Sequence, residues 1–68
     1  MFRYHKLLGR MKEMGLSQYQ LAQVIGMSES TLNVKLNCKS YFKQNEIVRI
    51  CDALDIDDCE VNSYFFSL

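Results

Sequence analysis

The amino-acid sequence predicts an all-α protein, a compact five-helix domain that spans residues 1–68. Apolar residues recur at helical spacing along most of the chain, and the alternation typical of strands is weak everywhere except near the C-terminus. Two short helical patterns are separated by three residues that begin with glycine, which is the spacing of a helix-turn-helix. A chain of 68 residues buries one small core, which excludes a two-domain enzyme, a doubly wound sheet and a barrel.

The first helix is expected over residues 3–14. Its apolar residues lie at positions i, i+3, i+4, i+7 and i+10, which form one stripe of a helix: Tyr4, Leu7, Leu8, Met11 and Met14. Gly15 fits the position just after a helix end, where glycine adopts a left-handed conformation without strain.

The second helix, over residues 18–25, has the most complete start signal in the chain. Ser17 and Gln20 have the spacing of a capping box, in which each of the two side chains accepts a backbone N–H of the other residue. Gly26 is expected to end this helix after about two turns.

The third helix is expected over residues 29–37, with Ser28 as its N-cap. Its capping box is incomplete, because Thr31 stands where glutamate or glutamine would complete it. Only three residues separate this helix from the second one, so the connection leaves no room for an extended loop. The two helices are therefore expected to cross at roughly 90–120°.

The fourth helix is expected over residues 44–54, with an apolar stripe formed by Ile47, Ile50, Cys51 and Leu54. Lys43 is a poor N-cap for it, and Glu46 in the first turn compensates through the helix dipole. A last helix, over residues 58–63, follows Asp57 as N-cap. The apolar tail, residues 64–68, either packs on the core or contacts a second chain as a strand or an aromatic patch.

The charges are divided between the two parts of the chain, although eight basic and eight acidic residues give a net charge of zero. Residues 1–43 carry seven basic and two acidic side chains, a net charge of +5. Residues 44–68 carry one basic and six acidic side chains, a net charge of −5. The total argues mildly against nucleic acid, but fields act over about 8–10 Å, so the distribution is more informative.

Several classes of protein are not expected. The three cysteines match no zinc pattern and His5 has no partner nearby in sequence, so we expect no metal, no cofactor, no catalytic residue and no small-molecule substrate. The odd number of cysteines indicates reduced thiols, and Cys51 reads as a core residue. Neither a signal peptide nor a membrane-spanning segment is predicted, and we expect a cytoplasmic protein without membrane contact.

Residues 16–32 resemble the helix-turn-helix of the lambda-repressor-like family, which includes the phage Cro and CI repressors. The matching positions are Gln18, Leu21, Ala22, Gly26 and Leu32. The resemblance covers about residues 5–56 and implies a lambda-repressor-like DNA-binding domain. Three short motifs after residue 32 look most like those of small phage repressors: Lys35-Leu36-Asn37, Tyr41-Phe42 and Tyr64-Phe65-Phe66.

Two positions depart from the family's pattern. Cys38 replaces the glycine that usually follows the third helix, so it must adopt a left-handed conformation at some cost or end the helix in another way. Lys35 replaces a residue that is usually aliphatic. We expect Leu36 to fill the core and the stem of Lys35 to run along the surface.

The resemblance implies that the third helix reads bases in the major groove of operator DNA. The expected base contacts are Ser28, Glu29, Ser30, Thr31, Asn33 and Val34. Asparagine can bond adenine and valine can touch a thymine methyl, whereas Glu29 equally fits a carboxylate at a helix N-terminus. The expected phosphate contacts are Gln18, Lys35, Asn37, Lys39, Tyr41 and Lys43.

The predicted function is a sequence-specific repressor of Cro or CI type that binds double-stranded operator DNA as a homodimer. Half-sites would lie about 34 Å apart, and the acidic part of the chain would face away from the DNA. The tail is the candidate dimer interface, with Tyr64, Phe65, Phe66 and Leu68 as its residues. The alternative is a helical protein-interaction module, such as an antirepressor or an antitoxin-like partner, that does not bind DNA.

Overall fold

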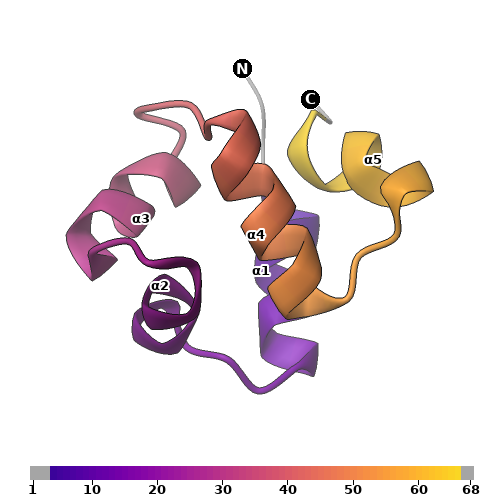
Figure 1. Cartoon of the computed structure of the whole chain (residues 1–68). Helices are drawn as coiled ribbons and strands as arrows, with labels where there is room; N and C mark the ends of the chain where they lie inside the picture. The colour runs from indigo at the N-terminus through magenta and orange to yellow at the C-terminus, as the bar shows by residue number, and fades with distance from the viewer. Residues whose placement is uncertain (1–3, 67–68) are drawn as a thin grey trace.

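A computed structural model describes residues 4–66, and within this range it contains helices and no strands. The elements in chain order are α1 His5–Glu13, α2 Gln18–Ile25, α3 Glu29–Leu36, α4 Gln44–Leu54, the 3₁₀ helix η1 Asp58–Glu60 and α5 Val61–Phe65. The predicted all-α, five-helix architecture is confirmed. Figure 1 shows α4 crossing the view in front of α1, with α2 and α3 on one side and α5 on the other.

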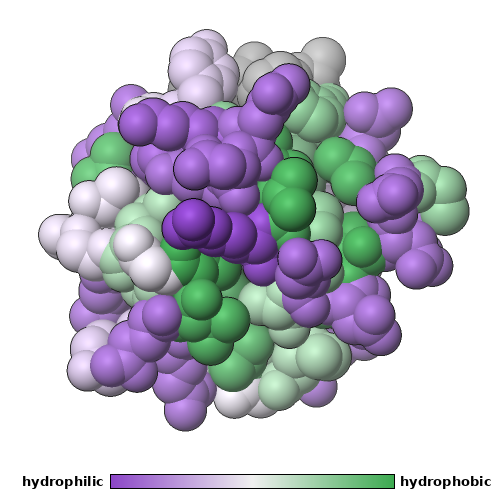
Figure 2. Space-filling view, in the orientation of Figure 1, coloured by the Kyte–Doolittle hydropathy of each residue, from purple (hydrophilic) through white to green (hydrophobic). Residues whose placement is uncertain are grey.

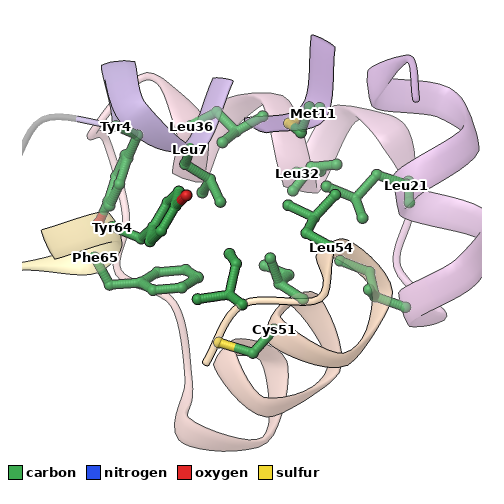
Figure 3. Close-up of a cluster of buried hydrophobic side chains, with 14 residues drawn as sticks. Tyr4, Leu7, Met11, Leu21, Leu32, Leu36, Cys51, Leu54, Tyr64 and Phe65 are labelled. Carbon is green, nitrogen blue, oxygen red and sulfur yellow. The ribbon is translucent and has the colours of Figure 1, made fainter. Parts of the chain in front are cut away.

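The core lies where the helices meet, and each α-helix contributes to it. The largest side chains that are almost fully buried are Leu7, Leu21, Leu32, Ile50, Leu54 and Phe65. Figure 3 shows this cluster, with Tyr64 and Phe65 directed from α5 toward Leu7 of α1. Burial of each such side chain contributes about 1.5–3 kcal/mol. Because α5 contributes one of the six, the short C-terminal helix is a structural part of the domain.

The first four α-helices end in the same way, with a residue in the left-handed conformation. These residues are Gly15, Gly26, Cys38 and Asp55, with φ of 71°, 75°, 63° and 54°. In each case the next N–H donates to the carbonyl five positions earlier, at 2.9–3.1 Å, as in a Schellman motif. Of the two possibilities expected for Cys38, the structure shows the left-handed conformation. Cys38 thus occupies the position in the Schellman motif that is usually glycine.

Several predicted boundaries differ from the observed ones. Helix α1 covers residues 5–13 rather than 3–14, and α3 ends at Leu36 rather than at residue 37. The segment predicted as one helix over 58–63 is a 3₁₀ turn followed by α5, which continues to residue 65. In the predicted apolar stripe of α1, Leu8 and Met14 are 38% and 42% exposed, because the core contacts only the face that carries the other three residues.

Two arginines bond to the carboxyl ends of helices in distant parts of the chain. The Arg10 Nε of α1 donates to the Leu54 carbonyl at the end of α4, at 2.9 Å. The Arg49 Nη1 of α4 donates to the Ile25 carbonyl at the end of α2, at 3.1 Å. Both bonds satisfy carbonyls that have no partner inside their own helix. Arg49 thereby joins α4 to the turn between α2 and α3.

Gly26 and Gly9 are expected to respond in opposite ways to the same substitution. Gly26 has φ of +75°, so Gly26→Ala is expected to lower the free energy of unfolding by about 1–2 kcal/mol. Gly9 lies inside α1 with no atom within 4 Å of an added Cβ. Gly9→Ala is expected to raise the free energy of unfolding by about 0.8–1 kcal/mol, because alanine has a higher helix propensity than glycine. Urea denaturation measures the stability of both variants. A loss of stability in both would contradict the conclusion that Gly9 occupies an ordinary helical position.

Candidate functional site

The predicted base-reading surface lies on α3 and begins with Ser28, the N-cap of this helix. The Ser28 Oγ accepts the backbone N–H of Thr31 at 3.2 Å and donates to the Thr31 Oγ1 at 2.8 Å. Both hydroxyl groups are therefore part of the cap as well as exposed. Glu29 and Ser30 are exposed in the first turn of the helix, where a carboxylate interacts favourably with the helix dipole.

Three amide side chains connect α2 to α3. The Asn33 Nδ2 donates to the Gln18 Oε1 at 3.0 Å, and the Asn37 Nδ2 donates to the Asn33 Oδ1 at 3.1 Å and to the Asn33 carbonyl at 2.7 Å. Asn33 is thus held between the start of α2 and the end of α3. Its Nδ2 has a second hydrogen and its Oδ1 a second lone pair, so these bonds use half of its capacity. The structure therefore brings Gln18, Asn33 and Asn37 together on one surface, where both asparagines are exposed and Gln18 is half-buried.

Val34 lies next to this amide chain and is 41% exposed. Its partial exposure matches the expectation that it faces away from the core. Together, the residues predicted to contact bases occupy one surface of the N-terminal and middle turns of α3. This surface is polar, with one apolar side chain and one carboxylate.

The prediction that Lys35 follows the surface is wrong. The residue is 7% exposed, and its Nζ donates to the Glu46 Oε1 in the first turn of α4. The same oxygen accepts the backbone N–H of Lys43 at 2.8 Å. The end of α3 lies beside the start of α4, where the Glu46 carboxylate neutralises the lysine. A phosphate contact by Lys35 would have to break this ion pair.

The environment of Glu46 favours its charged form. Burial alone would raise the pKa of the carboxyl, but hydrogen bonds from Lys35 and the Lys43 backbone, together with the charges of both lysines, lower it overall. The carboxylate therefore does three things: it neutralises a buried cation, caps α4 and ties α4 to α3.

The remaining predicted phosphate contacts lie between α3 and α4. Lys39, Tyr41 and Lys43 are all exposed, and Tyr41 is 77% exposed. Residues 16–43 contain three basic side chains, Lys35, Lys39 and Lys43. Since Lys35 is neutralised, Lys39 and Lys43 are the exposed lysines of the predicted DNA-facing segment.

The predicted dimer interface is corrected for two of its residues. Tyr64 and Phe65 are 7% and 1% exposed and belong to the core of their own chain. The Phe65 ring packs edge-on against Phe42 at 5.7 Å between centroids, and the Lys6 Nζ lies 4.8 Å from the Tyr64 ring centroid. Both residues lie in α5, which turns their rings inward onto α1 rather than toward a second chain. Phe66 is 46% exposed, and Leu68 lies outside the described residues.

A second surface, not predicted from the sequence, lies between α4 and the C-terminal segment. An open groove of about 400 Å³ has an apolar lining formed by Ile47, Val48, Cys51, Ile56, Val61 and Phe66. Its polar lining residues are Gln44, Asp52 and Asp58. A neighbouring hollow of about 230 Å³ shares Gln44, Ile47 and Phe66 with it. We call this surface the α4–α5 groove, and Figure 2 shows it as a green area between α4 and α5, bordered by purple.

The sequence contained a signal for this groove. Val48 lies outside the apolar stripe predicted for α4 and is 59% exposed. With Gln44 and Asp52 it forms a second stripe along the same helix, at spacing i, i+4 and i+8. What the sequence did not indicate is that the C-terminal segment would stand beside this stripe and form the other wall.

Comparison with known proteins shows the family. The family described as "Protein of unknown function (DUF739)" matches residues 1–68. The chain belongs to this family. The solution structure of the modulator of repression (MOR) of the temperate bacteriophage TP901-1 from Lactococcus lactis has a similar fold, with a TM-score of 0.81 and 35% sequence identity. The similarity covers 96% of this chain and 88% of that one. No curated protein matches the chain.

These findings refine the resemblance seen in residues 16–32. The DUF739 chain is similar to a regulatory protein of a phage, as the sequence predicted, but the family shown is DUF739 and not the Cro and CI repressors. Among the helices between residues 4 and 66, none is long and apolar enough to span a membrane.

The buried ion pair predicts a marked asymmetry between its two partners. Glu46→Ala leaves a buried ammonium group without a partner and removes the cap of α4, so we expect a loss of about 3 kcal/mol of stability. Lys35→Met fills the same space without a charge, and we expect a change of less than about 1.5 kcal/mol. Denaturation at neutral pH compares the two variants, and equal losses would contradict this description.

The same pair predicts how stability depends on pH. Because the folded-state pKa of Glu46 lies below the ordinary value of 4.5, its contribution is complete above that value and is lost as the pH falls through the folded-state pKa. The parent chain is therefore expected to lose more stability than Lys35→Met between about pH 5 and pH 3. Parallel curves for the two proteins would show that the pair does not cause the acid sensitivity.

Proposed function

We propose that this DUF739 chain is a phage regulatory protein that modulates repression by binding a repressor, and not by occupying an operator itself. The observation that carries the proposal is the similarity, over nearly the whole chain, to a protein whose name is modulator of repression. The shared fold and 35% identity support a related role for this chain. The predicted alternative of an interaction module without DNA binding is thus preferred over a repressor of Cro or CI type.

The electrostatics of the α2–α3 surface support this preference. Phosphate contacts supply most of the affinity of DNA-binding proteins, and each releases bound counterions. In the predicted DNA-facing segment, Lys35 is paired with Glu46, and Glu29 places a carboxylate in the first turn of α3. If each exposed lysine contacts one phosphate, the logarithm of the DNA-binding constant falls with the logarithm of the salt concentration with a slope of about −1.8. The slope is much steeper for a protein that makes 6–10 phosphate contacts.

The proposal is tested on the repressor encoded by the same phage or prophage. Occupancy of the operator by that repressor is measured with and without the full chain, and a mixture of chain and operator without repressor is the control. We expect the chain to change occupancy at concentrations at which it does not itself bind the operator. Unchanged occupancy at a large excess of chain would overturn the proposal.

The second candidate function is direct reading of operator DNA, and the geometry of Asn33 favours it. The amide chain from Gln18 to Asn37 fixes the orientation of Asn33 and leaves one hydrogen and one lone pair, the two positions that a bidentate contact with adenine requires. Val34 is exposed beside it.

This candidate predicts different effects for two substitutions. Asn33→Ala is expected to relax sequence preference, with a loss of about 1–3 kcal/mol on the preferred site, whereas Lys39→Ala weakens binding to all sequences alike. Binding to duplex DNA is measured over a range of salt concentrations. A flat dependence of log K on log salt would rule out the DNA-reading function, since phosphate contacts must release counterions.

A further inference from the structure

We propose that the α4–α5 groove is the docking site for an amphipathic helix with basic flanks, supplied by the protein partner. The inference deepens the proposed function and rests on it for the existence of a protein partner. It is carried by the shape of the groove, by its apolar lining and by the sign of the charges along it.

The groove has the dimensions and lining that a helix requires. Its wall on α4 runs from Gln44 to Asp52, a rise of about 12 Å, which matches about two turns of a bound helix. The apolar lining comes from both walls, with Val48 59% exposed on one and Phe66 46% exposed on the other. Helices bind such grooves through apolar residues at i, i+3, i+4 and i+7. The described residues contain no strand, so they offer no sheet edge to which an extended peptide could add.

The charges select the kind of helix. Asp52 and Asp58 line the groove and no basic residue does. Asp55, Asp57 and Glu60, close by in sequence, are exposed as well. The field of the two lining carboxylates reaches into the groove, because their charges add to burial in raising the pKa of the Cys51 thiol. Lysine or arginine beside the apolar residues of a bound helix would face these carboxylates, and acidic flanks would be repelled.

The same charges argue against a second copy of this chain as the occupant. A symmetric dimer places the same surface of both chains face to face. It would therefore gather four carboxylates, Asp52 and Asp58 of each chain, in one interface to which the groove supplies no basic side chain. Like charges at an interface cost several kcal/mol. Anionic lipid headgroups would be repelled for the same reason.

The test uses the full chain and two synthetic helical peptides with the same leucine stripe at i, i+3, i+4 and i+7. One peptide has lysine on both sides of the stripe, and the other has glutamate. Fluorescence anisotropy of a labelled peptide gives the affinity. We expect the lysine peptide to bind at least about tenfold tighter than the glutamate peptide, a preference of about 1.4 kcal/mol. Equal affinities, or no binding of either peptide, would overturn the inference.

Charge reversal in the groove provides the decisive comparison. In the double variant Asp52→Lys and Asp58→Lys we expect the preference to invert, so that the glutamate peptide binds more tightly. The matched control is Glu13→Lys with Glu29→Lys, which changes the net charge equally at exposed residues outside the groove. If the control variant also binds the glutamate peptide more tightly, the peptides respond to the net charge of the chain, and the α4–α5 groove is not their binding site. Circular dichroism confirms that each variant is folded.

A second pair of variants tests the apolar contact. Val48→Ser in the groove is expected to weaken the lysine peptide about fivefold, as expected for loss of roughly 1 kcal/mol of apolar burial. Val24→Ser is the control, because Val24 is 62% exposed on α2 and does not line the groove. Equal effects of the two substitutions would count against the groove.

The outcome separates this inference from the proposed function. If the chain changes operator occupancy by the repressor but binds neither peptide, the function stands and the groove is not its docking site. If the lysine peptide binds and its preference inverts in the groove variant, but operator occupancy never changes, the docking site stands and the proposed function is wrong.

Discussion

The ion pair between Lys35 and Glu46 ties the end of α3 to the start of α4 across the irregular segment that separates them. The chain between α3 and α4, residues 37–43, has no regular structure, and Lys43 offers no side-chain cap to α4. One carboxylate oxygen accepts both the ammonium group from the end of α3 and the N–H at the start of α4. Removing a partner from a buried pair costs far more than replacing both partners with apolar groups. The pair therefore links the end of α3 to the start of α4, although replacing both partners with apolar groups would change overall stability little.

The same contact changes what the α2–α3 surface is able to bind. A helix-turn-helix that binds DNA needs cations beside its second helix, and in this chain the lysine at the end of α3 is engaged in an internal ion pair. The turn itself is intact, with Gly26 in the left-handed conformation and Arg49 bonded to the end of α2. A turn between two helices and the charges that DNA binding requires are thus separate properties, which is why fold alone does not establish function.

Most of the fold was predictable because its signals are local. The capping box of Ser17 and Gln20, the N-cap at Ser28 and the glycines after α1 and α2 specify helix ends within a few residues of sequence. What the sequence could not reveal depends on contacts between distant residues. Lys35 was expected at the surface because its partner is 11 positions away. From the sequence, Tyr64 and Phe65 fit a dimer contact as well as they fit the core, because only the position of α5 against α1 shows that they are buried.

The division of charge acquires a different meaning once the helices are placed. In the sequence, the acidic half, residues 44–68, is only the part that would face away from DNA. In the structure it surrounds an apolar groove, where Asp52 and Asp58 lie beside exposed Val48. Apolar side chains that line a groove with carboxylates at its border are typical of an interaction surface. A protein that modulates repression through a partner needs a docking surface with both apolar area and a charge preference, and the groove combines the two.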